Sequence, residues 1–188
     1  MSARRHHIRR LVVLFSLAAL FAGTSVVPAS AGGTIQSGFQ MLKNGASAKC
    51  MDNPGSSQSW GVQMVQWTCG NPLPANQTWN LFYPNTGFGT WMIQNKASGL
   101  CLDVWQANYQ NGTKIVQWPC DGSDVAEQFI PQYGGTPCRY NPSGSFYTFR
   151  VWAKTSMVIE INGQTGADGT KLDIWQYWGA VHQSWYNC

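Results

Sequence analysis

The sequence predicts an all-β domain built from three similar units. Short runs rich in Val, Ile, Tyr and Trp alternate with turn dipeptides such as Asn-Gly, Pro-Gly and Asp-Gly, and no long stretch shows the apolar period of a helix. In addition, one pattern of acid, tryptophan and flanking positions recurs three times along the chain. We expect such a domain to be closed enough to hide the edges of its strands.

The first residues have the composition of an export signal. Four arginines precede an apolar run at residues 11–22, and Ala29-Ser30-Ala31 has the small-x-small form of a signal-peptidase site. The apolar run is too short for a membrane anchor, which needs about 20 residues. We therefore expect a signal peptide at residues 1–31, cleavage after Ala31, and a secreted, extracellular protein.

The remaining chain, residues 32–188, is long enough for one domain with a sizeable core. All ten tryptophans lie in this part. Without the four arginines of the signal, eight Lys and Arg balance eight Asp and Glu, so no basic face remains for nucleic acid or an anionic membrane. No Cys-x-x-Cys pair occurs and the mature chain has one histidine, His182, so we expect no metal. We also expect no cofactor and a monomer.

The repeated pattern is strict in its spacing. In each unit an acid stands fifteen residues before a tryptophan, and two flanking positions stand nineteen residues apart. The acid and tryptophan pairs are Asp52 with Trp67, Asp103 with Trp118, and Glu160 with Trp175. Between these pairs, residues 81–85, 91–95 and 146–152 have the β-branched and aromatic composition of strands.

Six cysteines allow fifteen pairings, and the phase of the repeats favours one of them. The favoured pairs are Cys50 with Cys69, Cys101 with Cys120, and Cys138 with Cys188. The first two pairs occupy the flanking positions of their units. In the third unit these positions hold Val158 and Tyr177, so both partners are absent together, as expected if each bond forms within its own unit.

Each unit then ends in a second signature, whose complete form is Asn-Gln-x-Trp. The three versions are Asn76-Gln77-Thr78-Trp79, Glu127-Gln128-Phe129-Ile130 and His182-Gln183-Ser184-Trp185. Together with Cys-Leu-Asp, a Gly-Thr turn and Gln-Trp-x-Cys, this triplicated order resembles the ricin B-type lectin repeat, also classed as a carbohydrate-binding module. The resemblance covers about Phe39 to the C-terminus. It implies that residues 32–188 form a β-trefoil of three pseudo-symmetric repeats, with Trp79 and Trp185 in the core.

The resemblance also implies a sugar site in each repeat. A pyranose has hydroxyls around its rim and an apolar C–H face, so it needs a flat aromatic and polar groups that bind adjacent hydroxyls. In the family these groups are the acid, the tryptophan and the polar residues of the closing signature. The implied residues are Asp52, Trp67, Asn76 and Gln77 in the first repeat, Asp103, Trp118 and Gln128 in the second, and Glu160, Trp175, His182 and Gln183 in the third.

The first of these sites is complete, and the other two depart from the pattern. Glu127 stands where Asn is expected in the second repeat, and an ionised carboxylate can only accept hydrogen bonds. His182 takes that position in the third repeat, beside a longer acid. In two repeats, Val65 and Val116 occupy a position at which many family members have a Gln that touches the ligand. We therefore expect the first site to be the strongest and the second the weakest.

Three function classes remain open. We favour a non-catalytic protein that binds neutral glycans or polysaccharides. A trefoil that acts through its loops, as a protease inhibitor or toxin-like protein without sugar binding, is the main alternative. A small glycosidase needs two carboxylates about 5 to 10 Å apart, whereas the acids here are assigned one per repeat, so we predict no catalytic residue. The identity of the sugar stays open.

Individual residues also keep a structural alternative. Trp67, Trp118 and Trp175 could belong to the core, because tryptophan is usually largely buried. Asp52 and Asp103 could only cap turns. In the loops between each acid and its tryptophan, Trp60 and Trp105 either extend a site or shield the core.

Overall fold

The protein is described here by a computed structural model that covers residues 34–84, 89–133 and 146–186. Every helix in these ranges is a three-residue 3-10 segment, and the remaining regular structure is β-strand. The all-β prediction is therefore confirmed. None of the described helices is long and apolar enough to cross a membrane. The expected signal peptide at residues 1–31 and the expected bond between Cys138 and Cys188 lie outside the described residues.

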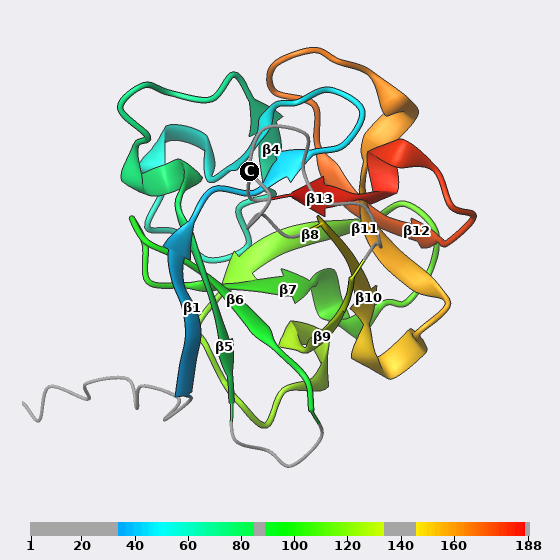
Figure 1. The fold of residues 1–188 in the computed structure, drawn as a ribbon. Helices are drawn as coiled ribbons and strands as arrows, with labels where there is room; N and C mark the ends of the chain where they lie inside the picture. The colour runs from blue at the N-terminus through cyan, green and yellow to red at the C-terminus, as the bar shows by residue number, and fades with distance from the viewer. Residues whose placement is uncertain (1–33, 85–88, 134–145, 187–188) are drawn as a thin grey trace, which may run out of the picture.

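Thirteen strands are present in the described ranges, and they form one continuous sheet that curves around the core (Figure 1). The strands are β1 Thr34–Gln40, β2 Lys43–Asn44, β3 Cys50–Asp52, β4 Val65–Trp67, β5 Trp79–Tyr83, β6 Met92–Asn95, β7 Cys101–Val104, β8 Thr113–Trp118, β9 Phe129–Tyr133, β10 Phe146–Val151, β11 Met157–Ile161, β12 Leu172–Gln176 and β13 Trp185–Tyr186. Their order across the sheet is β1-β5-β6-β7-β8-β12-β11-β10-β13-β2-β3-β4, with β9 paired to β10. The last strand, β13, thus lies between β10 and β2 and joins the end of the chain to its beginning.

Seven 3-10 helices connect these strands in the described ranges. They are η1 Pro54–Ser56, η2 Ala75–Gln77, η3 Trp105–Ala107, η4 Val125–Glu127, η5 Trp152–Lys154, η6 Asn162–Gln164 and η7 Val181–Gln183. Three of them, η2, η4 and η7, end two residues before a strand that begins with a buried aromatic. They stand at equivalent places in the three repeats.

The repeats share one register. The acid strand pairs antiparallel with the tryptophan strand in each, as β3 with β4, β7 with β8, and β11 with β12. The residue two before the acid lies opposite the tryptophan every time, as Cys50 opposite Trp67, Cys101 opposite Trp118, and Val158 opposite Trp175. Three units with the same pairing around one core make a β-trefoil, as predicted.

The core lies where the three repeats meet. Trp79 and Trp185 are fully buried, and their indole Nε1 atoms donate to the backbone oxygens of Met51 at 2.9 Å and Ile159 at 3.2 Å. Their assignment to the core is confirmed. In the second repeat the equivalent residue is Phe129, which is fully buried at the start of β9.

Two disulfide bonds fasten the first two repeats as the repeat phase predicts. Cys50 is bonded to Cys69 and Cys101 to Cys120, with Cα atoms 5.1 and 5.0 Å apart. Each bond ties the acid strand to the segment that follows the tryptophan strand. Closing a loop of this length contributes about 3 kcal/mol in the chain-entropy model.

Buried amides hold neighbouring repeats together. Gln66 on β4 is fully buried, and its Nε2 donates to the backbone oxygens of Thr165 at 2.7 Å and Ala167 at 3.0 Å in the third repeat. Gln117 on β8 binds two backbone oxygens of the first repeat in the same way. In the first two repeats the glutamine before the tryptophan is therefore structural, and the tryptophan beside it faces solvent.

A left-handed turn follows the acid strand in each repeat, and the second repeat places a strained residue there. The third residue after the acid has φ of 64° at Gly55, 55° at Gln106 and 63° at Gly163. A residue with a Cβ in this region loses about 1 to 2 kcal/mol, a penalty that glycine escapes. Gln106 is exposed, so no buried contact offsets this penalty.

We expect Gln106→Gly to raise the free energy of unfolding by about 0.5 to 1 kcal/mol, because it removes this strain. Denaturant unfolding would measure the change. Gly55→Gln is the reciprocal control and should destabilise by a similar amount, since the space around Gly55 is open and only the backbone conformation is at issue. A less stable Gln106→Gly variant would show that the turn is not strained.

Candidate functional site

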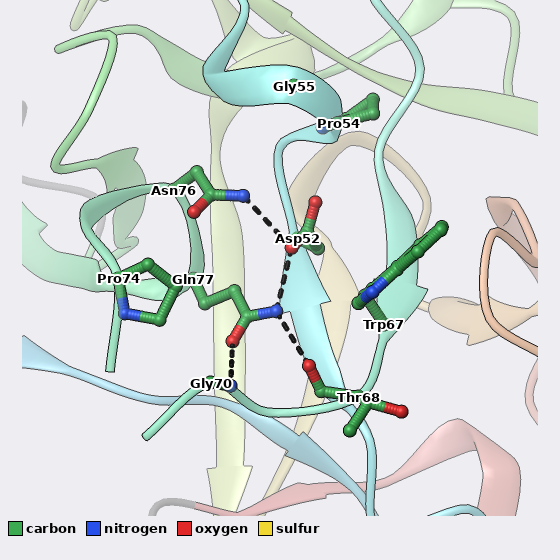
Figure 2. Close-up of a pocket in the computed structure, with 9 residues that line it drawn as sticks. All are labelled: Asp52, Pro54, Gly55, Trp67, Thr68, Gly70, Pro74, Asn76 and Gln77. Carbon is green, nitrogen blue, oxygen red and sulfur yellow. Dashed lines mark hydrogen bonds between the residues drawn. The ribbon is translucent and has the colours of Figure 1, made fainter. Parts of the chain in front are cut away.

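The first repeat brings its four predicted residues together around one pocket of about 400 Å³ (Figure 2). Asp52 ends β3, Trp67 ends β4, and Asn76 and Gln77 lie on η2. Because β3 pairs with β4 and η2 packs against β3, residues far apart in sequence meet at one place. We call this constellation the first site.

A hydrogen-bond network fixes the carboxylate of the first site. Asn76 Nδ2 and Gln77 Nε2 both donate to Asp52 Oδ2, at 3.0 and 2.8 Å, and Gln77 Oε1 accepts from the backbone N–H of Gly70 at 2.8 Å. Asp52 is 4% exposed, and burial raises the pKa of its carboxyl group while the two amides oppose that rise. The second oxygen of Asp52 points away from both amides, as Figure 2 shows. This second oxygen is therefore held in a fixed direction and can accept a hydrogen bond from a ligand.

The repeat tryptophans lie at the surface, contrary to the core alternative. Trp67 is 47% exposed, Trp118 36% and Trp175 38%. In the first site the indole stands beside Asp52 and away from the amides (Figure 2). The turn-capping alternative is also not supported for Asp52, because its partners are two side-chain amides. The first site thus combines an exposed ring with a fixed carboxylate.

In the second repeat, the structural counterpart of the closing signature lies one residue away from the alignment that the sequence suggests. In all three repeats a backbone N–H donates to the side chain that ends the 3-10 helix. The pairs are Gly70 with Gln77 Oε1 at 2.8 Å, Asp121 with Glu127 Oε2 at 2.6 Å, and Trp178 with Gln183 Oε1 at 3.1 Å. Glu127 is therefore the counterpart of the glutamines, and Ala126 stands where the first repeat has Asn76.

The predicted sugar contact by Gln128 is wrong. Gln128 is 1% exposed, its Nε2 donates to the backbone oxygens of Gly122 at 2.9 Å and Asp124 at 3.2 Å, and its Oε1 accepts from Thr90 at 2.7 Å. This side chain anchors a loop. Likewise Ile130 does not occupy the core position of Trp79 and Trp185, because Phe129 takes that position.

The second site is a pocket of about 320 Å³ whose lining includes Asp103, Trp105, Trp118 and Ala126. Glu127 is not among the lining residues. It is fully buried, and its Oε1 has no hydrogen-bond partner. Burial raises the pKa of Glu127 to about 9, with the negative charges of nearby aspartates adding to the effect. Glu127 is therefore protonated at neutral pH and carries a hydrogen-bond donor, whereas the sequence alone suggested an acceptor.

The acid of the second site is also perturbed. Asp103 is 6% exposed, and burial raises its pKa to about 7, followed by a smaller contribution from the charge of Asp124. In the first site two amides oppose the same burial effect. The difference follows from the replacement of Gln by Glu127 and of Asn by Ala126.

Two further tryptophans border the second site. Trp60, from the loop of the first repeat, lies 5.6 Å from Trp118 between ring centroids, and Trp105 on η3 lies 6.1 Å from it. Trp60 is 62% exposed. It thus extends the aromatic surface around Trp118 rather than shielding the core.

The third site contains Glu160, Trp175, His182 and Gln183. Gln183 Nε2 donates to Glu160 Oε2 at 2.8 Å, as its counterpart does in the first site. His182 occupies the position of Asn76, and its Nε2 lies 3.3 Å from the same carboxylate oxygen. Burial lowers the pKa of His182, so its imidazole is neutral at neutral pH.

Asp173 is a residue of the third site that the sequence-based prediction missed. It lies opposite Glu160 on β12 and is 1% exposed. Asn162 Nδ2 donates to its Oδ2, while its Oδ1 has no partner. Burial raises the pKa of Asp173 to about 6, with the hydrogen bond from Asn162 opposing and the charge of Glu160 adding to the rise. The premise of one acid per repeat is therefore wrong for the third repeat.

The sequence carries a signal for Asp173. The residue thirteen positions after each repeat acid is Val65, Val116 and Asp173 in turn, and each lies opposite its acid in the sheet.

The structure does not point to a metal site. No group of three or more metal-ligating side chains occurs among the residues that the structure describes.

Known structures share this fold. The designed three-fold symmetric protein ThreeFoil is 22% identical with a TM-score of 0.69, over 79% of this chain and 96% of ThreeFoil. An exo-beta-1,3-galactanase from Clostridium thermocellum is 23% identical with a TM-score of 0.68, over 81% of this chain and 30% of the galactanase. The Macrolepiota procera ricin B-like lectin, solved with lactose, is 18% identical with a TM-score of 0.57, over 81% of this chain and 96% of the lectin.

At such low identities these likenesses show the fold alone. No curated protein matches the chain in sequence. The family is shown by a different comparison. Residues 27–118 and 75–175 each match the family model described as ricin-type beta-trefoil lectin domain-like, and the two matches together span most of the chain. Their overlap is expected from a repeated sequence. The protein therefore belongs to the ricin-type beta-trefoil lectin domain-like family.

Proposed function

We propose that this protein is a secreted, monomeric carbohydrate-binding protein that recognises neutral glycans mainly through its first site. The observation that carries the proposal is the carboxylate of Asp52, held by Asn76 and Gln77 beside the exposed ring of Trp67. A free carboxylate oxygen accepts a sugar hydroxyl, and an indole face packs on the apolar C–H face of the ring. The site needs little rearrangement, which lowers the entropy lost on binding.

The family and the disulfides support this proposal. One family member of similar fold, the Macrolepiota procera lectin, was solved with lactose. Two disulfide bonds are typical of a protein that folds in an oxidising compartment, in agreement with export and removal of residues 1–31.

The proposal gives the protein no catalytic role of its own, although one similar structure is a galactanase. The pair of acids in the third site would be the candidate for glycoside hydrolysis. Glu160 and Asp173 are direct cross-strand neighbours, so their carboxyl groups lie side by side rather than on two sides of a bound sugar. A hydrolase needs its two carboxyl groups to flank the scissile bond.

A glycan and polysaccharide screen of the mature protein, residues 32–188, tests the proposal. Trp67→Ala should weaken binding to the best ligand about tenfold, because it removes the stacking face. Phe39→Ala is the matched control, since Phe39 is 49% exposed, close to the 47% of Trp67, and lines neither pocket. Its affinity for the same ligand should be unchanged.

Each other outcome points to a different function. A screen without any bound glycan would favour an interaction protein that acts through its loops. Release of sugar from a polysaccharide would favour an enzyme. Unchanged affinity in Trp67→Ala would place the binding surface elsewhere on the protein.

A further inference from the structure

The third site differs from the first two in having a second acid directly opposite the repeat acid. Glu160 on β11 and Asp173 on β12 lie opposite each other, and Trp175 follows two residues later on the same face of β12. Cross-strand neighbours of this kind are in direct reach of each other. The residues equivalent to Asp173 are Val65 and Val116, both buried and apolar. An acid directly opposite the repeat acid in the sheet is thus found in the third repeat alone of the three.

Among the residues that the structure describes, no lysine or arginine forms an ion pair with either of these acids. The hydrogen-bond donors to the two carboxylates, Gln183 and Asn162, are uncharged amides. His182 lies 3.3 Å from Glu160, but burial lowers the pKa of His182 and keeps it neutral. Lys114 on β8 lies opposite Asp173 in the sheet, yet it is exposed. In the part of the chain that the structure describes, the ion pair between charged side chains joins Lys49 to Asp168, outside this site.

Two buried polar atoms in this site also lack hydrogen-bond partners. They are Asp173 Oδ1 and His182 Nε2, on side chains that are 1% and 5% exposed. Buried polar groups are nearly always paired, and buried charges are nearly always compensated. A neutral sugar would supply hydroxyl donors but no positive charge. A ligand with an ammonium group would supply both.

We propose that the third site binds a protonated amino sugar, with its ammonium group toward Glu160 and Asp173 and its ring on Trp175. The inference rests on the proposed function, in that it takes the repeat sites as saccharide sites. Trp175 is 38% exposed and stands to its acid as Trp67 stands to Asp52, so a pyranose ring fits it in the same way. This aromatic face favours an amino sugar over a lysine side chain as the source of the cation.

The test compares oligomers of glucosamine with N-acetylglucosamine oligomers of the same length at neutral pH, because acetylation removes the charge and keeps the ring. Binding is followed through the indole N–H signals of Trp175 and Trp67 in NMR titrations. The glucosamine oligomer should shift Trp175 at a concentration about tenfold lower than its acetylated form, since only the former is a cation. Equal titration of Trp175 by both forms would overturn the proposal.

Asp173→Val is the matched variant, because valine occupies this position in the other two repeats. It should remove the preference of Trp175 for the glucosamine oligomer and leave the response of Trp67 unchanged. Asp173→Asn keeps a polar side chain without the charge, so it should lose the same preference even if the valine variant folds poorly. Retention of the preference in Asp173→Asn would overturn the assignment.

A third comparison separates the ligand class from simple charge attraction. A pentalysine peptide should not displace the glucosamine oligomer from Trp175, and displacement at equal concentration would show a general cation site instead.

The proposed function is tested apart from this inference, through Trp67 and neutral glycans. If neutral glycans fail to shift Trp67 while glucosamine shifts Trp175, the first proposal fails and this one stands.

Discussion

Glu127→Gln is expected to stabilise the protein, and the gain is expected to grow with pH. The substitution restores the residue that the other two repeats have at this position, with its Oε1 in place to accept the backbone N–H of Asp121. Its Nε2 would lie where Glu127 Oε1 now has no partner, and there it can donate to Asp103 as Gln77 donates to Asp52. Satisfying a buried group of this kind contributes about 1 to 3 kcal/mol.

The pH dependence follows from the direction of the pKa shift. Burial raises the pKa of Glu127 from 4.5 to about 9, so the folded protein holds a proton that the unfolded chain has already lost. Stability from this group is complete below the unfolded pKa and falls as pH rises toward the folded value. The pKa shifts of Asp103 and Asp173 have the same direction. The pH ranges over which they reduce stability end near their folded pKa values of about 7 and about 6.

Above neutral pH the loss of stability should therefore arise mainly from Glu127 among these three acids. Denaturant unfolding at a series of pH values would show a declining stability for the natural protein and a flatter curve for Glu127→Gln. Gln183→Glu is the reciprocal control, because it places a carboxyl group at the equivalent position of the third repeat and should steepen the decline. Parallel curves for the natural protein and Glu127→Gln above neutral pH would show that Glu127 ionises without cost.

Much of the fold could be predicted because it depends on local rules that the sequence repeats. The constant spacing of acid and tryptophan gives the register of β3 with β4, β7 with β8, and β11 with β12, and the cysteines stand at the ends of that same register. The first site could be predicted for the same reason. All of its residues lie on the hairpin and on the 3-10 helix that packs against it.

The second and third sites could be predicted only in part. In the second repeat the sequence Glu127-Gln128-Phe129 can be aligned with the closing signature in two ways. Aligning Gln128 with the other glutamines gives the wrong one, because the Gln128 side chain binds backbone oxygens of a loop. The decisive contact is a hydrogen bond from Asp121 that no sequence pattern shows. In the third repeat the sequence shows an acid at Asp173. Its place in the site follows only from the strand pairing that sets it opposite Glu160. The charges of both sites likewise depend on burial.

Asp52→Ala is expected to lose binding at the first site and to lose stability at the same time. The substitution leaves two amides without their shared acceptor at a residue that is 4% exposed, although Asn76 and Gln77 each keep one backbone oxygen as a partner. We expect the free energy of unfolding to fall by about 1 to 3 kcal/mol. Affinity for a neutral glycan should fall about tenfold or more, since the hydroxyls that Asp52 accepts lose their partner.

Asp52→Asn separates the two effects, because the network fixes the orientation of the new amide. The two amides of Asn76 and Gln77 donate to one oxygen of Asp52, so the asparagine oxygen should take that place and its NH₂ group should face the pocket. An acceptor for the ligand thereby becomes a donor. Stability should stay close to that of the natural protein, while binding measured by calorimetry should fall as far as in Asp52→Ala. Full binding by Asp52→Asn would mean that the free oxygen of Asp52 is not the atom that receives the sugar hydroxyl.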